Sequence, residues 1–167
     1  MLQNKLDNIY NEAVEKVIAI NIPLEPERIA RISLNTRAKK RWGQCKKLPS
    51  GRFEININAD LVSQSEDGTL NTVIHELLHT VNGCLNHGRQ WQVYANRINN
   101  AYGINVKRIS TSEEKGVERV IVKPEYKYIL KCECCDQTIR RQKKSKIVEH
   151  PEHFSCGLCG GRFKRVV

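Results

Sequence analysis

The pattern His75-Glu76-Leu77-Leu78-His79 constrains this chain more than any other part of its sequence. Side chains four residues apart on a helix lie on the same face, so the imidazoles of His75 and His79 can bind one metal ion. Glu76 projects to one side of this pair and can act on a water molecule in an open coordination position without binding the metal itself. The alternative is an exposed helix that carries two histidines by chance.

Apolar residues at helical spacing flank this pattern and favour the metal site over the exposed helix. They are Leu70, Val73, Ile74, Leu77, Leu78 and Val81. The dipeptides Asp67-Gly68 and Asn82-Gly83 are turn signals on either side. The sequence therefore predicts one buried helix over residues 69–81.

A third metal ligand is expected, because catalytic zinc sites commonly use three protein ligands and leave the fourth position to water. The chain can turn back after Asn82-Gly83, and His87 is the next histidine. No acidic residue occurs between Glu76 and Glu113 that can serve instead. His87 is therefore the predicted third ligand, with a solvent-facing histidine as the alternative. Cys84 is interpreted as a buried thiol, although it lies close enough in sequence to approach the metal.

The composition limits both the size of the domains and the kind of partner. With 167 residues, the chain can hold a domain of about 110 residues and a small second module. The formal net charge is +10 and the sequence pI is about 9.4. This excess of positive charge favours an acidic partner, of which DNA or another nucleic acid is the commonest kind. A solvated basic surface without a partner is the alternative.

The N-terminal segment is amphipathic and lacks the continuous apolar core of a signal peptide, and no apolar run has the length of a membrane span. We therefore expect an intracellular, cytoplasmic protein without membrane contact. Association with DNA would place it at a nucleoid or in a nucleus. In a reducing compartment, the seven cysteines favour metal ligands or buried thiols over disulfides.

Hydrophobic periodicity predicts further elements around the metal helix. Residues 1–20 and 89–101 have the spacing of amphipathic helices, and the second follows His87 directly. Residues 32–35 and 53–58 alternate like half-buried strands, with a turn signal at 49–51 between them. A small antiparallel sheet is therefore expected beside the metal helix.

Residues 110–116 are polar and without periodicity, which makes them the predicted linker. We therefore expect one domain over residues 1–112 and a second over 113–167. Strands are predicted at residues 117–122 and 126–130.

Two cysteine pairs in the second domain have the spacing of a structural zinc site. Cys132 and Cys135 form the first pair, and Cys156 and Cys159 the second, with twenty residues between the pairs. Four thiolates coordinate zinc tetrahedrally and leave no open position, so this metal would stabilise the fold without taking part in catalysis. Free thiols are the alternative reading.

Cys134 is an alternative ligand in place of Cys132 or Cys135, although the two-residue gap favours those two. His150 and His153 are weaker substitutes.

A basic stretch lies between the two cysteine pairs. Its cationic residues are Arg140, Arg141, Lys143, Lys144 and Lys146. Such a stretch can bind phosphates, but it contains no aromatic residue for base stacking. The alternative is a solvated loop, so these five residues are candidate nucleic-acid contacts only.

Taken together, these motifs resemble the SprT-like, or Spartan-type, zinc metallopeptidases. The resemblance runs from about residue 29 to residue 163 in the order of the family. Its motifs are Arg37-Ala38-Lys39-Lys40-Arg41-Trp42-Gly43-Gln44-Cys45, Ile55-Asn56-Ile57-Asn58 leading into Leu61, the pattern at 75–79, His87-Gly88 with Trp91, and the two cysteine pairs.

The resemblance implies an α+β fold, in which a small zincin-like metallopeptidase domain of helices packed on a short antiparallel sheet precedes a C-terminal β zinc ribbon. It implies two zinc ions, one catalytic ion held by His75, His79 and His87 and one structural ion, with Glu76 as the general base. No small-molecule cofactor is evident. Characterised relatives cleave proteins crosslinked to DNA and are activated by DNA, which implies protein and DNA as partners and a role in repair of DNA-protein crosslinks.

Two other functions remain open at this point. The chain can be a zinc-stapled nucleic-acid-binding module without peptidase activity, or an intracellular peptidase that acts on unmodified regulatory proteins.

Overall fold

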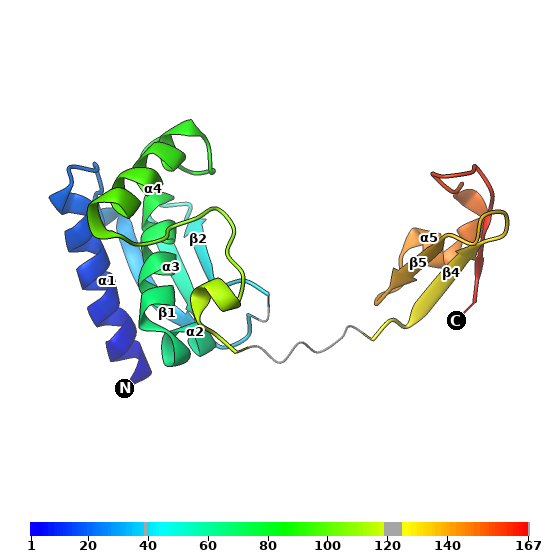
Figure 1. The fold of residues 1–167 in the computed structure, drawn as a ribbon, viewed down its shortest axis with the longest axis horizontal. Coiled ribbons are helices and arrows are strands. Elements are labelled where there is room, and N and C mark those ends of the chain that lie inside the picture. The colour runs from blue at the N-terminus through cyan, green and yellow to red at the C-terminus, as the bar shows by residue number, and fades with distance from the viewer. Residues whose placement is uncertain (39, 119–124, 167) are drawn as a thin grey trace. The chain divides into compact units, whose positions relative to one another are not determined.

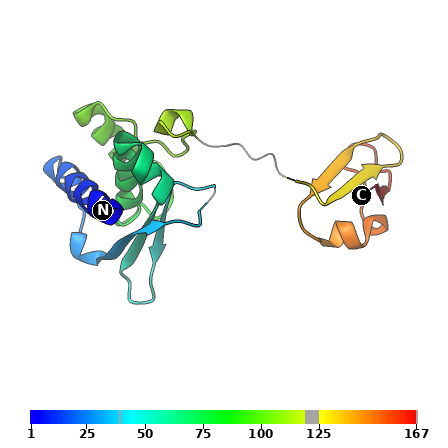
Figure 2. The same cartoon turned by 90° about the horizontal axis from the view of Figure 1, so that it is seen from below.

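The computed structural model describes residues 1–38, 40–118 and 125–166, and it divides the chain into two compact units, residues 1–119 and 120–167 (Figure 1). The N-terminal unit mixes helices with a three-stranded sheet, as expected for an α+β protein. Its elements are α1 (Leu2–Ala19), η1 (Pro26–Arg28), β1 (Ile29–Asn35), β2 (Gly43–Lys47), β3 (Phe53–Asn58), α2 (Ala59–Gln64), α3 (Glu66–Leu78), α4 (Arg89–Tyr102) and η2 (Glu113–Lys115). Figure 2 shows its helices gathered on one face of the sheet. None of the helices that the structure describes has the length and apolar character needed to cross a membrane.

The sheet is mixed, so the predicted antiparallel pairing of residues 32–35 with 53–58 is wrong. The central strand β3 pairs in parallel with β1, where Ile32 faces Ile55, and antiparallel with β2, where Cys45 faces the same Ile55. The predicted turn at 49–51 joins β2 to β3, not β1 to β3. Strand β2 was not predicted from the sequence because its residues are mostly polar and do not alternate with apolar ones. Such a composition is tolerated in an edge strand.

The core of this unit lies between the sheet and the helices. The apolar face predicted for residues 1–20 is confirmed in α1, where Leu6, Ala13 and Val17 are fully buried. They pack in one cluster with apolar residues of β3 and α3, so α3 is covered by α1 as well as by the sheet. The helix that carries the histidine pattern is thus packed within the core.

Helix α3 begins three residues before the predicted start. Ser65 caps it, its Oγ accepting from the backbone N–H of Gly68 at 3.0 Å, so Asp67 and Gly68 belong to the first helical turn and the predicted turn before the helix is wrong. Gly68 is required by a close approach: a Cβ there would lie 2.5 Å from the carbonyl oxygen of Lys115. The helix ends at Leu78, also before the predicted limit.

The helix predicted at 89–101 is confirmed as α4, which ends at Gly103 in the left-handed conformation with φ of 64°. The chain then returns along the N-terminal unit. The Asn99 side chain bonds both the N–H and the C=O of Val106, and Val106, Lys115 and Val117 are buried. Because residues up to Val117 pack on the first unit, the two units divide between residues 119 and 120 and not between 112 and 113.

The C-terminal unit is a small antiparallel sheet with one short helix. Its elements are β4 (Tyr128–Cys132), β5 (Thr138–Arg141), α5 (Lys146–Glu149), η3 (Pro151–His153) and β6 (Phe163–Arg165), and the strand order is β5-β4-β6. Five residues form its buried cluster: Leu130, Cys132, Val148, Cys156 and Phe163. The strand predicted at 126–130 is observed at 128–132, whereas residues 119–122 of the strand predicted at 117–122 lie outside the described residues.

Candidate active site and metal centres

Three imidazoles converge beside the sheet of the N-terminal unit. His75 lies in the last turn of α3, His79 follows at its C-cap with helical backbone angles, and His87 lies in the loop before α4. The Nε2 atom of His75 is 3.3 Å from Nε2 of His79 and 2.9 Å from Nε2 of His87. The predicted ligands therefore meet at one point, and three histidines suit the coordination preferences of zinc.

The other ring nitrogens of two of these histidines face backbone carbonyl oxygens. His75 Nδ1 lies 2.9 Å from the carbonyl oxygen of Lys107, and His79 Nδ1 lies 2.8 Å from that of Cys84. A carbonyl oxygen only accepts, so each Nδ1 carries the proton and each Nε2 presents a lone pair inward. Burial, reinforced by the neighbouring histidines, lowers the pKa of His75 to about 3, and burial also lowers the pKa values of His79 and His87. The rings are thus neutral, which is the form that binds a metal ion.

Trp91 on α4 forms the floor of this cluster. It is 2% exposed, and its ring centroid lies 4.9 Å from that of His75 and 4.6 Å from that of His87. The packing of Trp91 fixes the orientation of the imidazoles.

Glu76 lies next to the three histidines and is almost fully buried, with 6% of its surface exposed. Strand β2 passes so close that a Cβ at Gly43 would lie 2.4 Å from Glu76 Oε1. Burial raises the pKa of Glu76 to about 7, against the opposing effects of the Cys45 backbone N–H and the positive charges of Lys115 and Arg41. A carboxyl with this pKa can take up and release a proton near neutral pH, as a general base requires.

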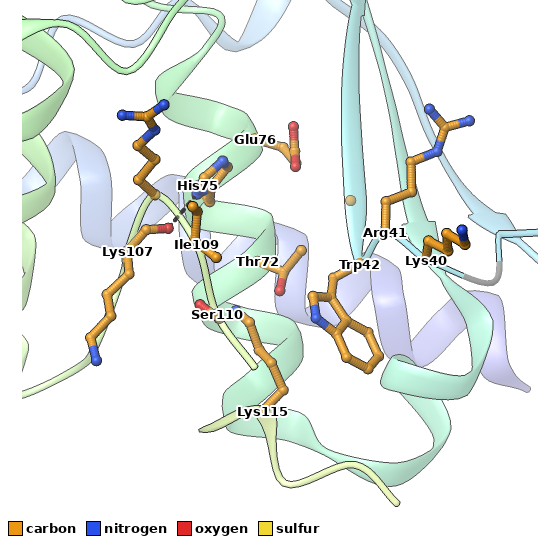
Figure 3. Close-up of a pocket in the computed structure, with 12 residues that line it drawn as sticks. Lys40, Arg41, Trp42, Thr72, His75, Glu76, Lys107, Ile109, Ser110 and Lys115 are labelled. Carbon is orange, nitrogen blue, oxygen red and sulfur yellow. Dashed lines mark hydrogen bonds between the residues drawn. The ribbon is translucent and has the colours of Figure 1, made fainter. Parts of the chain in front are cut away.

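Two cavities share Gly43, His75 and Glu76 in their walls. The first, of about 440 Å³, is lined further by Gln44, Cys45, Lys47, Phe53, His79, Leu85, Asn86 and His87. The second, of about 240 Å³, is lined further by Lys40, Arg41, Trp42, Thr72, Lys107, Arg108, Ile109, Ser110 and Lys115, and we call it the basic cavity (Figure 3). The Glu76 side chain therefore borders both cavities.

The three histidines and Glu76 lie within a segment of the chain that matches a known protein family. The model of the SprT-like family matches residues 6–112, which is more than half of the chain and includes Glu76 and all three histidines. The chain belongs to the SprT-like family. Its N-terminal unit is therefore a metallopeptidase-like SprT domain.

Two curated relatives carry related sequences within much longer proteins. The Germ cell nuclear acidic-1 protein of Caenorhabditis elegans is 24% identical over 146 residues, which cover 83% of this chain and 25% of that protein. The Germ cell nuclear acidic protein of Drosophila melanogaster is 31% identical over 94 residues, which cover 54% of this chain and 8% of that protein. The SprT-like chain thus corresponds to a quarter or less of each relative.

The C-terminal unit, which follows the SprT-like match, brings the four predicted cysteines together. Cys132 Sγ lies 3.5 Å from Cys159 Sγ, Cys135 Sγ lies 3.6 Å from Cys156 Sγ, and all four sulfur atoms lie within 4.8 Å of one another. None is in a disulfide. Hydrogen bonds from the backbone N–H groups of Cys135 and Cys134 lower the pKa of Cys132 to about 7. Four sulfur atoms at this spacing fit one tetrahedral zinc ion.

The alternative ligands lie apart from this cluster. Cys134 is exposed, and within the described residues it is not grouped with the four sulfur atoms. His150 and His153 gather instead around the exposed carboxylate of Glu152, at 3.5 Å and 3.6 Å. The geometry therefore favours the four-cysteine set over every substitute that the sequence left open.

The five basic residues singled out in this unit are all exposed. Arg140 and Arg141 end β5, Lys143 and Lys144 follow in the loop after it, and Lys146 is the first residue of α5. Because all five are exposed and lie within seven consecutive residues, their side chains are available to a polyanion.

Several groups of the SprT-like site could not be singled out from the sequence. The carbonyl oxygens of Lys107 and Cys84 act through the backbone, which carries no sequence signal. Gly43 belongs to one of the motifs that carry the family resemblance, and its lack of a side chain leaves room for Glu76. Lys115 was placed in a linker, although it is buried in the basic cavity.

Proposed function

We propose that this chain is a zinc-dependent endopeptidase with a zincin-like catalytic domain, in which Glu76 is the general base and His75, His79 and His87 hold the catalytic ion. The observation that carries the proposal is the convergence of the Nε2 atoms of three histidines beside the buried carboxylate of Glu76, which is not itself a member of the ligand group. A purely structural metal site does not need such a carboxylate.

The residues of the chain have defined tasks in this reaction. Zinc, when bound, would supply Lewis acidity, lowering the pKa of a bound water and polarising the peptide carbonyl. Glu76 accepts the proton of the attacking water and delivers it to the leaving amine. The carbonyl oxygens of Lys107 and Cys84 hold the imidazoles in the ligand tautomer, and their packing on Trp91 holds them in place.

An extended polypeptide fits this site because β2 is an edge strand. In the order β1-β3-β2 its outer edge pairs with no other strand among the residues that the structure describes, and it leads past Glu76 from Gly43 to Lys47. A substrate segment can add to this edge as a further strand. Pairing through the middle of a chain requires no free terminus, which favours endopeptidase activity.

We further propose that the enzyme acts on DNA-bound or DNA-crosslinked proteins, and hence works at a nucleoid or in a nucleus. The net charge of +10 and the exposed basic stretch of the C-terminal unit support binding to DNA. Two relatives named as germ cell nuclear proteins support a nuclear setting for this kind of domain.

Incubation of the zinc-loaded chain with a basic DNA-binding protein, with and without single-stranded DNA, tests this function. Fragments of the substrate are expected, in larger amount when DNA is present. Fragments in equal amount with and without DNA would favour a peptidase of unmodified proteins. Salt-dependent DNA binding without any fragments would favour a nucleic-acid-binding module.

Replacing Lys143, Lys144 and Lys146 together with alanine is expected to weaken binding to single-stranded DNA. If all three contact phosphates, the slope of log affinity against log salt concentration should fall by about two, since each phosphate contact on a single strand contributes roughly 0.7. Fluorescence anisotropy across a salt series measures this. A chain with Lys5→Ala and Lys16→Ala on α1 is the control, and an equal loss in both chains would contradict the assignment.

Gly43→Ala is expected to lower peptide hydrolysis by about 10²-fold, because a Cβ at this position displaces the Glu76 carboxylate by a substantial fraction of an ångström. The zinc content should not change, since the three atoms nearest to a Cβ at Gly43 all belong to Glu76 and not to a proposed ligand. Gly157→Ala is the control, because a Cβ there meets no atom within 4 Å. Hydrolysis by Gly43→Ala at the parent rate would show that Glu76 can move without loss.

A further inference from the structure

We propose that the basic cavity holds an acidic side chain of the protein substrate, on the carboxyl side of the bond that is cleaved, and that Lys115 is its central contact. This inference rests on the proposed endopeptidase function, because the cavity matters through its position beside Glu76. It adds to that function a preference for an acidic substrate residue after the cleaved bond.

The walls of the basic cavity are dominated by positive charge. Three separate segments contribute five cationic side chains: Lys40 and Arg41 before β2, Lys107 and Arg108 after α4, and Lys115 in η2. Glu76 is the only carboxylate among the residues that line it. Figure 3 shows Arg41 and Trp42 facing Thr72, His75 and Glu76 of α3 across the cavity, with Lys115 at one end.

Most of the cationic side chains of the basic cavity form no salt bridge with a described residue of the chain. Lys107 pairs with Glu114 at 2.8 Å. Among residues 1–38, 40–118 and 125–166, no carboxylate lies within 4 Å of the charged groups of Lys40, Arg41, Arg108 or Lys115. The cavity therefore offers an excess of unneutralised positive charge to whatever enters it.

Lys115 is unusual among these residues because it is buried, with only 6% of its surface exposed. Its Nζ donates to the carbonyl oxygen of Gly68 at 3.4 Å, a long hydrogen bond that leaves two of its three donors for a ligand. Burial lowers the pKa of Lys115 to about 8, while Glu76 and Glu114 oppose this shift, so the amine is mainly charged at neutral pH. A buried ammonium is stabilised when an anion approaches it.

The shape and position of the cavity favour a side-chain carboxylate over a DNA phosphate. The cavity measures about 240 Å³ and shares His75 and Glu76 with the metal site. A side chain next to the cleaved bond can enter it while the peptide occupies the site. A DNA strand that reached Lys115 would instead cover Glu76 and exclude the peptide.

The direction of β2 indicates which side of the cleaved bond the acidic residue occupies. The basic cavity lies at the start of β2, with Lys40 to Gly43, whereas the other cavity follows β2 to Lys47. Antiparallel pairing is the commoner arrangement of strands. A substrate antiparallel to β2 runs from Lys47 toward Gly43, so the residues after the cleaved bond reach the basic cavity.

Lys115 lies beyond residues 6–112, the segment that the SprT-like family model matches. The close approach of its carbonyl oxygen to Gly68 anchors η2 against α3 and thereby places the amine in the cavity. The acidic preference is accordingly a property that the family match does not specify.

A series of neutral peptides, in which a single Glu or a matched Gln is moved along the chain, tests the proposal with the full zinc-loaded protein. Cleavage is expected at the bond directly before the Glu, with kcat/KM about tenfold above that of the Gln peptide. Lys115→Met should reduce this ratio to about one and Lys115→Arg should keep the preference. Because the charge of Lys115 also lowers the pKa of Glu76, the readout is the ratio of the Glu to the Gln peptide within each variant. Lys5→Met, on α1, is the control.

Binding of the same peptides to the Glu76→Gln chain, followed by fluorescence anisotropy, separates the two proposals. Tighter binding of the Glu peptide that depends on Lys115, without cleavage by the parent chain, would support the cavity and contradict the endopeptidase. Equal cleavage and equal binding of Glu and Gln peptides would overturn the cavity proposal alone. So would a loss of single-stranded DNA binding in Lys115→Met with no effect on peptides, which would assign the cavity to phosphate.

Discussion

Glu76→Gln is expected to keep both zinc ions and to cleave protein substrates about 10²- to 10⁴-fold more slowly than the parent chain. The amide has nearly the shape of the carboxyl group, so it fits the tight space beside Gly43. It cannot accept the proton of the attacking water at neutral pH. The three imidazoles that would hold the ion do not include Glu76, so metal binding should persist.

Cleavage rates at saturating substrate, together with the zinc content of each purified chain, measure this effect. Glu66→Gln, at an exposed position in the first turn of α3, is the matched control and should behave like the parent. Cleavage by Glu76→Gln at the parent rate would exclude Glu76 as the general base. Loss of zinc together with activity would mean that Glu76 is a ligand.

Cys156→Ser is expected to remove one zinc ion and to unfold the C-terminal unit while the N-terminal unit stays folded. The buried cluster of the C-terminal unit has only five residues, and two of them are the proposed ligands Cys132 and Cys156. A core of this size does not stabilise a module of this length without disulfides or a bound metal ion. A structural zinc ion contributes roughly 10–16 kcal/mol in zinc-finger peptides, so its loss should exceed the stability of the unit.

Hydrogen exchange followed by mass spectrometry measures both units in the same sample. In Cys156→Ser, protection should vanish from β4 to β6 and persist in α1 and α3. Cys134→Ser is the control, because Cys134 is exposed and lies outside the sulfur cluster. Full protection of β4 in Cys156→Ser would contradict a structural role of the metal, as would equal damage by Cys134→Ser.

The elements that the sequence predicted correctly are those whose signal is local. Helices α1 and α4 follow from apolar residues at helical spacing, and Gly103 marks the end of α4. The convergence of His75 and His79 follows from the geometry of a single helix. His87 was placed by its spacing and by the absence of other donors, and the loop before α4 brings it to the same point.

The errors arise where partners far apart in the sequence decide the structure. Alternation identified β1 and β3 as strands, but it contains no information on which strand pairs with which, and the polar edge strand β2 intervenes between them in the chain. The segment around Lys115 lacks periodicity and is nevertheless packed on α3, because Gly68 leaves room for its backbone. Close approaches of this kind become visible only in three dimensions.

The zinc content of three chains purified in the same way tests the central claim most directly: the parent, His79→Ala and Cys156→Ser. If the three histidines and the four cysteines each hold an ion, the parent should contain two zinc ions per chain and each variant one. The ion retained by His79→Ala should be lost when Cys156 is also replaced. A parent chain with a single zinc ion that His79→Ala retains in full would contradict the catalytic metal site, and with it the proposed peptidase.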